Sequence, residues 1–302
     1  MYKISVILTT YNCDRIIKKT LDSILNQDEV DKKFKLELIV VDDCSIDRTV
    51  EIIKTKNVLF FSTKKNTGGP NKGRNIGLKH SSGDFICIAD QDDYWKPNRV
   101  ISLLPFCEKY PIVTSGFFVV NNKNKKNSVR VKENNEGFIY YRKNETFIKR
   151  LKKSKKGQNT YLGSIIFSKK LKKFIFEEYF GAVDYDWKLK IFYQNESLEI
   201  CKPLYVRNVN DKNLSLNEAY RTKDFFFSLM TIEKYFDDYP TEVKKANLRI
   251  HGSRARYYYL TNNMVLARFY FLQSEKNLKT FFYYLSTFIG SNWVKRNFNV
   301  FG

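Results

Sequence analysis

The sequence predicts an α/β fold: a mostly parallel β-sheet covered by helices on both faces, followed by a helical C-terminal region. Two observations predict the sheet. Short apolar segments alternate with helical segments through the first hundred residues, and strands that are apolar throughout are typical of parallel sheets buried on both faces. A third observation predicts the C-terminal region, because the pattern becomes helical and aromatic from about residue 216.

The expected strands and helices follow one another in order. The strands are short apolar segments bounded by polar or turn-forming residues, and they cover residues 4–8, 36–41, 58–61 and 86–89. Helices are expected between them, over residues 16–25, 49–54 and 72–78. The first has apolar side chains at helical spacing, and the last is a basic segment that follows a turn-rich loop. Farther along, we expect a strand over 161–167, a helix after Asp184 and a helical hairpin over 246–288.

Three of the strands end in polar clusters, at residues 9–12, 42–43 and 90–93. The carboxyl ends of parallel strands open onto one crevice, where ligands bind. The last cluster holds three carboxylates in four residues, and these repel one another unless a cation lies between them. Hard oxygen donors suit Mg²⁺ or Mn²⁺, so a metal–diphosphate site is expected. The alternative, an acidic turn that caps the next helix, is disfavoured because the three clusters converge.

Each cluster suits part of a nucleotide-sugar. Thr9 and Tyr11 end the first strand, and Tyr11 is expected to stack on a base. Asp42 is expected to accept a hydrogen bond from the imide of uracil, although Asp43 or Ser45 of the same cluster would also suit a helix N-cap. Arg74 follows the turn at residues 66–70, and its guanidinium matches acceptors on the base or the diphosphate.

Four motifs in this order resemble the family 2 glycosyltransferases of the GT-A fold. They are SVILTTYN at 5–12, IVVDDCSID at 39–47, GRNIG at 73–77 with GDF at 83–85, and DQDD at 90–93. The resemblance implies a Rossmann-like nucleotide-binding sheet, a DxD metal site and inversion at the anomeric carbon. In its terms Asp42 is the uracil-binding acid and Tyr11 the stacking position, while Asp90 lies near the ribose as first acid of the DxD motif. Asp92 is the direct ligand of Mn²⁺ or Mg²⁺.

The second half is expected to bind the acceptor. Inverting transfer needs a carboxylate that takes the proton of the acceptor hydroxyl, and Asp184 matches the family's base at a helix start. Asp186 is the rival, with N-capping as its other role. Val183 stands where the family usually has a Glu that helps to orient the acceptor, so this chain departs from the family pattern at that contact.

A second departure follows Arg207, which is expected to neutralise the leaving diphosphate or, alternatively, to form a surface salt bridge. Relatives often have a His three residues later, where it helps to bind the metal or the diphosphate, but this chain has Asn210. Because an amide is a weaker ligand than imidazole for a transition metal, we expect modest metal affinity that favours Mg²⁺.

The chain is strongly basic. Its 302 residues include 53 Lys and Arg against 32 Asp and Glu, a net charge of +21. Residues 121–173 hold 17 Lys and Arg against 3 acidic residues, which is +14 of that charge. Such a segment attracts an anionic membrane surface or a polyanionic glycan, unless it is only a solvated face. No nucleic acid is expected as a partner, since no recognition motif for it occurs.

Cysteine and histidine usage excludes other classes. The five cysteines have no CxxC spacing, which argues against a disulfide framework or a structural zinc site. Two histidines exclude a His-rich metal centre. No apolar run of about 18 residues and no signal-peptide pattern occurs. We therefore expect a cytoplasmic protein, either free or peripheral at the inner face of the cell membrane.

These observations predict a catalytic domain over residues 1–215, with a nucleotide-binding half (1–100) and an acceptor half (101–215). The helical region over 216–302 is expected to pack against the catalytic domain or form a homo-oligomer, with membrane docking as the alternative. The predicted activity is metal-dependent, inverting transfer of a hexose or N-acetylhexosamine from a UDP-sugar. The acceptor is a hydroxyl of a bacterial surface glycan, such as a capsule, lipooligosaccharide or teichoic acid, free or lipid-linked.

Two other classes stay open at this level. A nucleotidyltransferase would share the fold and the metal, but it usually has a glycine-rich, basic loop after the first strand, and residues 9–12 do not resemble one. A non-catalytic glycan-binding module would need neither a metal pair nor a base.

Overall fold

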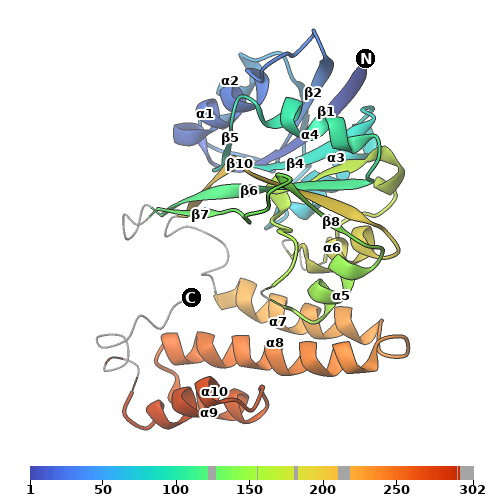
Figure 1. The fold of residues 1–302 in the computed structure, drawn as a ribbon. Helices are drawn as coiled ribbons and strands as arrows, with labels where there is room; N and C mark the ends of the chain where they lie inside the picture. Colours follow the sequence, from blue (N-terminus) through green and yellow to red (C-terminus); the bar gives the residue numbers. More distant parts are fainter. Residues whose placement is uncertain (122–126, 155, 180–182, 210–217, 291, 293–302) are drawn as a thin grey trace. The chain divides into compact units, whose positions relative to one another are not determined.

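The computed structural model describes residues 1–121, 127–154, 156–179, 183–209, 218–290 and 292 (Figure 1). The chain divides into two compact units. The first consists of residues 1–147 and 157–216, and the second of residues 148–156 and 217–302. Strands dominate the first unit, and the second is helical.

One sheet runs through the described residues of the first unit. Its strands are β1 (Tyr2–Thr10), β2 (Phe34–Asp42), β3 (Leu59–Ser62), β4 (Phe85–Asp90), β5 (Tyr94–Trp95), β6 (Ile112–Asn121), β7 (Ser128–Arg130), β8 (Phe138–Tyr141), β9 (Ile166–Ser168) and β10 (Ser197–Val209). The order is β3-β2-β1-β4-β9-β6-β10-β5, with β7 beside β6 and β8 beside β10. The neighbours among β3, β2, β1 and β4 are parallel, as are β6 and β10. Strands β5, β7, β8 and β9 pair antiparallel, so the expectation of a mostly parallel sheet is confirmed.

The helices of this region are α1 (Asp14–Leu25), α2 (Thr49–Lys54), α3 (Asn71–His80), α4 (Arg99–Cys107), α5 (Glu145–Leu151), whose residues are shared between the two units, and α6 (Tyr185–Phe192). The four apolar segments predicted as strands in the first hundred residues are β1 to β4, each within two residues of the expected bounds. Strands β1, β2 and β4 are buried because helices cover the sheet, and their side chains form a continuous apolar core with α1 and α4. Strand β3, at the edge of the sheet, is only partly buried.

Helix α3 lies very close to β1 because two of its residues are glycines that face the strand. A Cβ atom at Gly77 would lie 2.3 Å from Cγ2 of Ile7, and one at Gly73 would lie 2.8 Å from Cγ2 of Thr9. Real Cβ atoms do not approach so closely, so the helix could not rest here with any larger residue. This approach places the start of α3 beside the carboxyl end of β1.

The prediction of a strand over 161–167 is partly wrong. Residues Leu162–Ser164 form a 3₁₀ turn, and only Ile166–Ser168 is a strand. Ser164 Oγ donates a hydrogen bond to the carbonyl of Tyr161 at 2.7 Å, and Asn159 Oδ1 accepts one from the Tyr161 N–H at 3.0 Å. Such local side-chain bonds compete with a β-ladder for the backbone groups.

In the second unit, the prediction of a helical hairpin over 246–288 is also wrong. The helices here are α7 (Glu218–Glu233), α8 (Pro240–Leu260), α9 (Met264–Leu272) and α10 (Leu278–Ser286). Two asparagines divide the predicted hairpin into three helices. Asn263 and Asn277 cap α9 and α10 by accepting hydrogen bonds from the N–H groups of Leu266 and Thr280, at 3.3 and 2.9 Å.

Some of the aromatic side chains in this unit form its own core, in which α8, α9 and α10 pack through Tyr258, Tyr259, Phe271 and Tyr283. Others, including Phe281 and Phe282, are exposed. In the described part of the chain, every helix is too short or too polar to cross a bilayer.

Candidate active site

The three polar clusters lie at one edge of the sheet. The register of the parallel strands places Thr10 opposite Asp42 and Thr9 opposite Asp90. The carboxyl ends of β1, β2 and β4 are therefore adjacent, as the order of the apolar segments indicates.

Arg74 and Asp90 form an ion pair at this edge. The Nη2 atom of Arg74, on α3, lies 2.9 Å from Oδ1 of Asp90. The guanidinium is buried and lies 5.3 Å from the ring centre of Phe176. Its Nε has no hydrogen-bond partner among the described residues. Arg74 thus reaches the strand end where the sequence places it, but one of its donors is already bound to a carboxylate of the acidic cluster.

Asp93 has a structural role. Its buried carboxylate accepts hydrogen bonds from the N–H of Asn208, at 2.7 Å, and from the hydroxyl of Tyr205. Asn208 also donates from its side chain to the carbonyl of Asp92, at 2.6 Å. These bonds fix the acidic turn after β4 to the neighbouring part of β10.

Asp92 and Arg207 lie in each other's electrostatic field. Burial, together with the negative charge of Asp90, raises the pKa of Asp92 to about 6, and the charge of Arg207 acts in the opposite direction. The guanidinium of Arg207, on β10, lies 4.6 Å from the ring centre of Tyr161. A carboxylate that burial makes costly to ionise gains most from a nearby cation. Asn210, the second departure from the family pattern, lies outside the described residues.

The two acids at the carboxyl end of β2, Asp42 and Asp43, hold loops together. Asp42 is 1% exposed, and its carboxylate accepts hydrogen bonds from the hydroxyl of Thr10, at 2.9 Å, and from the N–H and hydroxyl of Ser45, at 2.8 and 2.6 Å. A uracil imide would have to share this carboxylate, so the assignment of Asp42 to the base stays a prediction. Asp43 accepts from Thr63 and Thr67, in the loop that leads to α3.

The alternative N-cap role of Asp43 or Ser45 is wrong for α2. That helix begins after Arg48, and the nearby carboxylate that accepts from the N–H of Thr49, at 3.0 Å, belongs to Asp47.

Gln91 holds the loop that carries Tyr11, a role that the sequence did not indicate. Its side-chain amide accepts from the N–H of Tyr11 at 2.7 Å and donates to the Tyr11 carbonyl at 3.2 Å. Tyr11 itself is 43% exposed. A side chain in this position can pack on a planar ligand without first leaving the core. The only available signal for Gln91 was its place between the two acids of the DxD pattern.

Asp184 and Asp186 differ in accessibility. Asp184 lies directly before α6, its side chain is 30% exposed, and its Oδ2 lies 2.7 Å from Nζ of Lys188. The side chain of Asp186 is 3% exposed and pairs with Lys190 at 2.6 Å. An acceptor hydroxyl could reach the first carboxylate more readily than the second. Val183, where relatives usually have Glu, is buried.

A buried asparagine joins the Arg74–Asp90 pair to the segment before Asp184. Asn71, at the start of α3, donates from Nδ2 to the carbonyls of Val183, at 3.0 Å, and Glu177, at 2.7 Å. Its Oδ1 accepts from Nη1 of Arg74 at 3.0 Å. A single amide thus contacts the partner of Asp90 and the peptide group directly before Asp184. Sequence reasoning missed this residue because its partners are backbone groups far along the chain.

The donors at this edge suit a hard cation, but they do not form a complete metal shell. Across the residues that the structure describes, no three His, Cys, Asp or Glu side chains are grouped to hold a metal ion. Asp93 is bound to Tyr205 and Asn208, which leaves Asp92 and Asp90 as the candidate ligands. Mg²⁺ is commonly held in this way, by one or two carboxylates together with phosphate oxygens and water.

Comparison with known proteins identifies the family. Residues 5–175 match the model of glycosyl transferase family 2. The chain belongs to this family. The family 2 glycosyltransferase expected from the four motifs is therefore confirmed.

Several curated relatives align with parts of the chain. The poly(ribitol-phosphate) β-N-acetylglucosaminyltransferase TarS of Staphylococcus aureus is 43% identical over 114 residues, which cover 36% of this chain and 20% of TarS. The GalNAc(5)-diNAcBac-PP-undecaprenol β-1,3-glucosyltransferase of Campylobacter jejuni is 37% identical over 98 residues, 31% of this chain and 30% of that protein. These alignments span less than a third of either relative.

Solved structures confirm the GT-A fold. The crystal structure of residues 1–349 of S. aureus TarS matches with a TM-score of 0.58 at 18% identity, covering 98% of this chain and 92% of that one. The same fragment in complex with UDP-GlcNAc also gives a TM-score of 0.58 at 18% identity, covering 97% and 92%.

Proposed function

We propose that the protein transfers a hexose or N-acetylhexosamine from a UDP-sugar to a hydroxyl of a bacterial surface glycan, with inversion. The observation that carries the proposal is the link through Asn71 between the Arg74–Asp90 pair and the segment before Asp184. It brings together, in one unit, groups suited to a diphosphate and a carboxylate suited to deprotonate an acceptor. The family supports glycosyl transfer.

The relatives support the choice of donor and acceptor. Their names describe transfer of glucose or N-acetylglucosamine to poly(ribitol phosphate) or to undecaprenol-diphosphate-linked glycans. TarS has been crystallised with UDP and with UDP-GlcNAc. We extend these properties to this chain as a UDP-sugar donor and a free or lipid-linked glycan acceptor.

The donor occupies the carboxyl edge of the sheet in this proposal. Tyr11 packs on the base, Asp42 binds the uracil imide, and Thr9 and Arg74 line the floor of the site. Asp90 lies near the ribose. Asp92, assisted by Asp90, would hold Mn²⁺ or Mg²⁺, whose charge offsets that of the diphosphate. The raised pKa of Asp92 supports this role, because a cation would stabilise the ionised form that burial disfavours.

The transfer step is a direct displacement at the anomeric carbon. Asp184 takes the proton of the acceptor hydroxyl as its oxygen bonds to the sugar. The bond between the anomeric carbon and the diphosphate breaks on the opposite face, and UDP leaves with the bonding electrons. Arg207 stabilises the charge that develops on the diphosphate, since a fixed guanidinium lowers the energy of a departing anion.

Two features of the chain bear on where the enzyme works. The basic segment over 121–173 would draw it to an anionic membrane surface, where a lipid-linked acceptor resides; residues 122–126 and 155 of this segment lie outside the described residues. The exposed Phe281 and Phe282 on α10 would support a homo-oligomer or a membrane contact. We propose a peripheral location at the inner face of the membrane.

The proposal is tested by incubating the protein with a panel of UDP-sugars and measuring UDP release with and without Mg²⁺ or Mn²⁺. We expect release with one UDP-hexose or UDP-N-acetylhexosamine, and loss of about a thousandfold in Asp92→Asn. Asp237→Asn, an exposed acid in the second unit, is the matched control and should retain activity. Pyrophosphate release from a nucleoside triphosphate would instead assign the protein to the nucleotidyltransferases. Absence of any turnover with saturable glycan binding would make it a glycan-binding module.

A further inference from the structure

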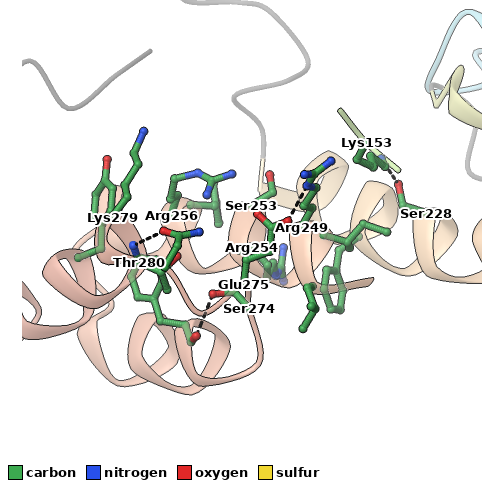
Figure 2. Close-up of a pocket in the computed structure, with 18 of the residues that line it drawn as sticks. Lys153, Ser228, Arg249, Ser253, Arg254, Arg256, Ser274, Glu275, Lys279 and Thr280 are labelled. Carbon is green, nitrogen blue, oxygen red and sulfur yellow. Dashed lines mark hydrogen bonds and ion pairs between the residues drawn. The ribbon is translucent and has the colours of Figure 1, made fainter. Parts of the chain in front are cut away.

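The second unit contains a basic pocket that has no part in the candidate active site. It has a volume of about 550 Å³ and is lined by Lys153, Ser154 and Lys156 together with residues of α7 to α10 and of the loop between α9 and α10. Figure 2 shows Arg249, Arg254 and Arg256 among the side chains around it. Seven Lys and Arg side chains line the pocket against two acids, Asp224 and Glu275.

Both acids already have partners within the pocket. Glu275 accepts from Nε of Arg249 at 2.8 Å, an interaction visible in Figure 2. Asp224 accepts from the hydroxyl of Ser228 at 3.4 Å, and that hydroxyl also accepts from Nζ of Lys153 at 3.0 Å. Glu275 offsets the charge of Arg249, and Asp224 contributes one further negative charge. An excess of five positive charges around a pocket, three of them on the exposed Lys156, Arg256 and Lys279, attracts an anion.

Arg254 is the most deeply buried of the cations that line the pocket. Its side chain is buried, and Nη2 donates to Thr222 at 3.0 Å and to the hydroxyl of Tyr258 at 2.7 Å. Nε and Nη1 have no hydrogen-bond partner among the residues that the structure describes. Leaving buried guanidinium donors without an acceptor is costly. Both atoms are shielded from solvent, so a ligand with two acceptor oxygens, such as a phosphate, would satisfy them once the side chain turns towards it.

Other wall residues suit a hydroxylated molecule. Ser253, Ser274 and Thr280 line the pocket beside Arg256 and Lys279. The hydroxyl of Ser274 donates to the carbonyl of Phe271 at 2.8 Å, so its lone pairs can accept from a ligand hydroxyl. The volume of the pocket exceeds what one phosphate fills, which leaves room for a polyol or sugar attached to it.

We propose that this pocket binds a phosphorylated polyol or sugar, with Arg254, Arg256 and Lys279 on the phosphate and the serine and threonine hydroxyls on the polyol. The phosphate is either the monoester of a free metabolite or the diester of a polymer backbone. The pocket lies wholly in the second unit, so the proposal stands or falls independently of the transferase activity.

The test is calorimetric titration of the full chain at constant ionic strength with glycerol 3-phosphate, glycerophosphoglycerol, inorganic phosphate and sulfate. We expect saturable binding of an organic phosphate with a Kd below about 1 mM. Tighter binding of glycerol 3-phosphate would identify a free monoester as the natural ligand. Tighter binding of glycerophosphoglycerol would identify a polymer backbone. If inorganic phosphate or sulfate binds as tightly as either, the pocket is a general anion site and the proposal is wrong.

Paired variants locate the site. The double variant Arg256→Ala and Lys279→Ala should weaken binding at least about tenfold. The control, Lys244→Ala and Lys245→Ala, removes the same charge from exposed positions of α8 that do not line the pocket, and it should change Kd less than about twofold. Thermal unfolding shows whether each variant is folded. Arg254→Lys keeps the charge but loses the forked donors, and it should also lose affinity. Equal losses in both double variants, or full affinity in Arg254→Lys, would overturn the proposal.

Discussion

The side-chain amide of Asn71 donates a hydrogen bond to the carbonyl of Val183 at 3.0 Å, directly before the candidate base Asp184. Through its oxygen, the same amide accepts from Arg74, whose other arm is paired with Asp90. One buried side chain thus sets the position of the donor edge relative to the acceptor segment. Four predictions follow from this arrangement and from the charges around the sheet.

Replacing Asn71 should impair the reaction more than it impairs the fold. Asn71→Ala removes the bonds to Val183 and Arg74, and we expect kcat/KM to fall at least about tenfold because misplaced groups lose near-attack geometry. Asn75→Ala is the matched control. Asn75 lies one turn later on α3 and bonds the backbone of Phe176, away from Asp184. Steady-state kinetics combined with urea unfolding separates the two effects. Equal loss of activity in the two variants at equal stability would show that Asn71 has no positioning role.

Asp184 and Asp186 should respond differently to the same substitution. Asp184→Asn should abolish transfer while UDP binding, measured by calorimetry, is retained, because only the proton acceptor is lost. Asp186→Asn should instead lower the unfolding temperature, since the buried Asp186 pairs with Lys190 and its loss leaves that charge with a weaker partner. An active Asp184→Asn protein would place the base elsewhere.

Asp92 and Asp93, in the turn after β4, should also differ: substitution of Asp92 should affect activity, and substitution of Asp93 should affect stability. Asp92→Asn should lose metal-dependent turnover but keep its unfolding temperature, because the neutral amide avoids the burial cost that raises the pKa of Asp92. Asp93→Asn should destabilise the protein by about 1–3 kcal/mol, since Asn208 and Tyr205 both donate to that carboxylate. Thermal unfolding and UDP release, measured on both variants, show whether one variant loses activity and the other loses stability. A stable, active Asp93→Asn protein would contradict the structural role.

Glu37 should make stability depend on acid pH. Burial alone would raise its pKa, but hydrogen bonds from Lys3, Ser5 and Ser82 outweigh burial and lower the pKa from 4.5 to about 2. Because the folded state favours the ionised form, the contribution of Glu37 is fully present above pH 4.5 and is lost as the pH falls towards 2.

Glu37→Gln should therefore cost about 1–2 kcal/mol at neutral pH, with the difference shrinking as the pH falls towards 2. Urea unfolding at several pH values measures it. Glu51→Gln is the control, since the Glu51 side chain is largely exposed and pairs only at the surface with Arg48. A stability difference that grows on acidification would contradict a lowered pKa for Glu37 in the folded state.

The sequence predicted the sheet because its strands are apolar throughout and end in polar clusters. This pattern can be recognised without knowing how the strands pack. The sequence also predicted that Arg74, on the helix after the turn-rich loop, could reach the base or the diphosphate. In the structure α3 approaches the strand ends closely because Gly73 and Gly77 face β1. The contributions of Asn71 and Gln91 could not be predicted. Each binds backbone groups 80 to 112 residues away. Because nearly every residue type offers the same backbone groups, the sequence does not indicate such a partner.

The helical region failed to follow prediction for a related reason. The aromatic pattern over 246–288 is continuous, but its interruptions depend on which asparagines act as caps. Asn263 and Asn277 do so. Local hydrogen bonds therefore divide into three helices a segment that the apolar spacing predicted as a hairpin.

The two bonds from Asn208 to the turn after β4 have a consequence for the thermodynamics of donor binding. Since Asn208 directly follows Arg207, Arg207 and Asp92 are held in fixed relation before any nucleotide arrives. Binding then costs little conformational entropy on the protein side, so affinity for UDP should be governed mainly by enthalpy.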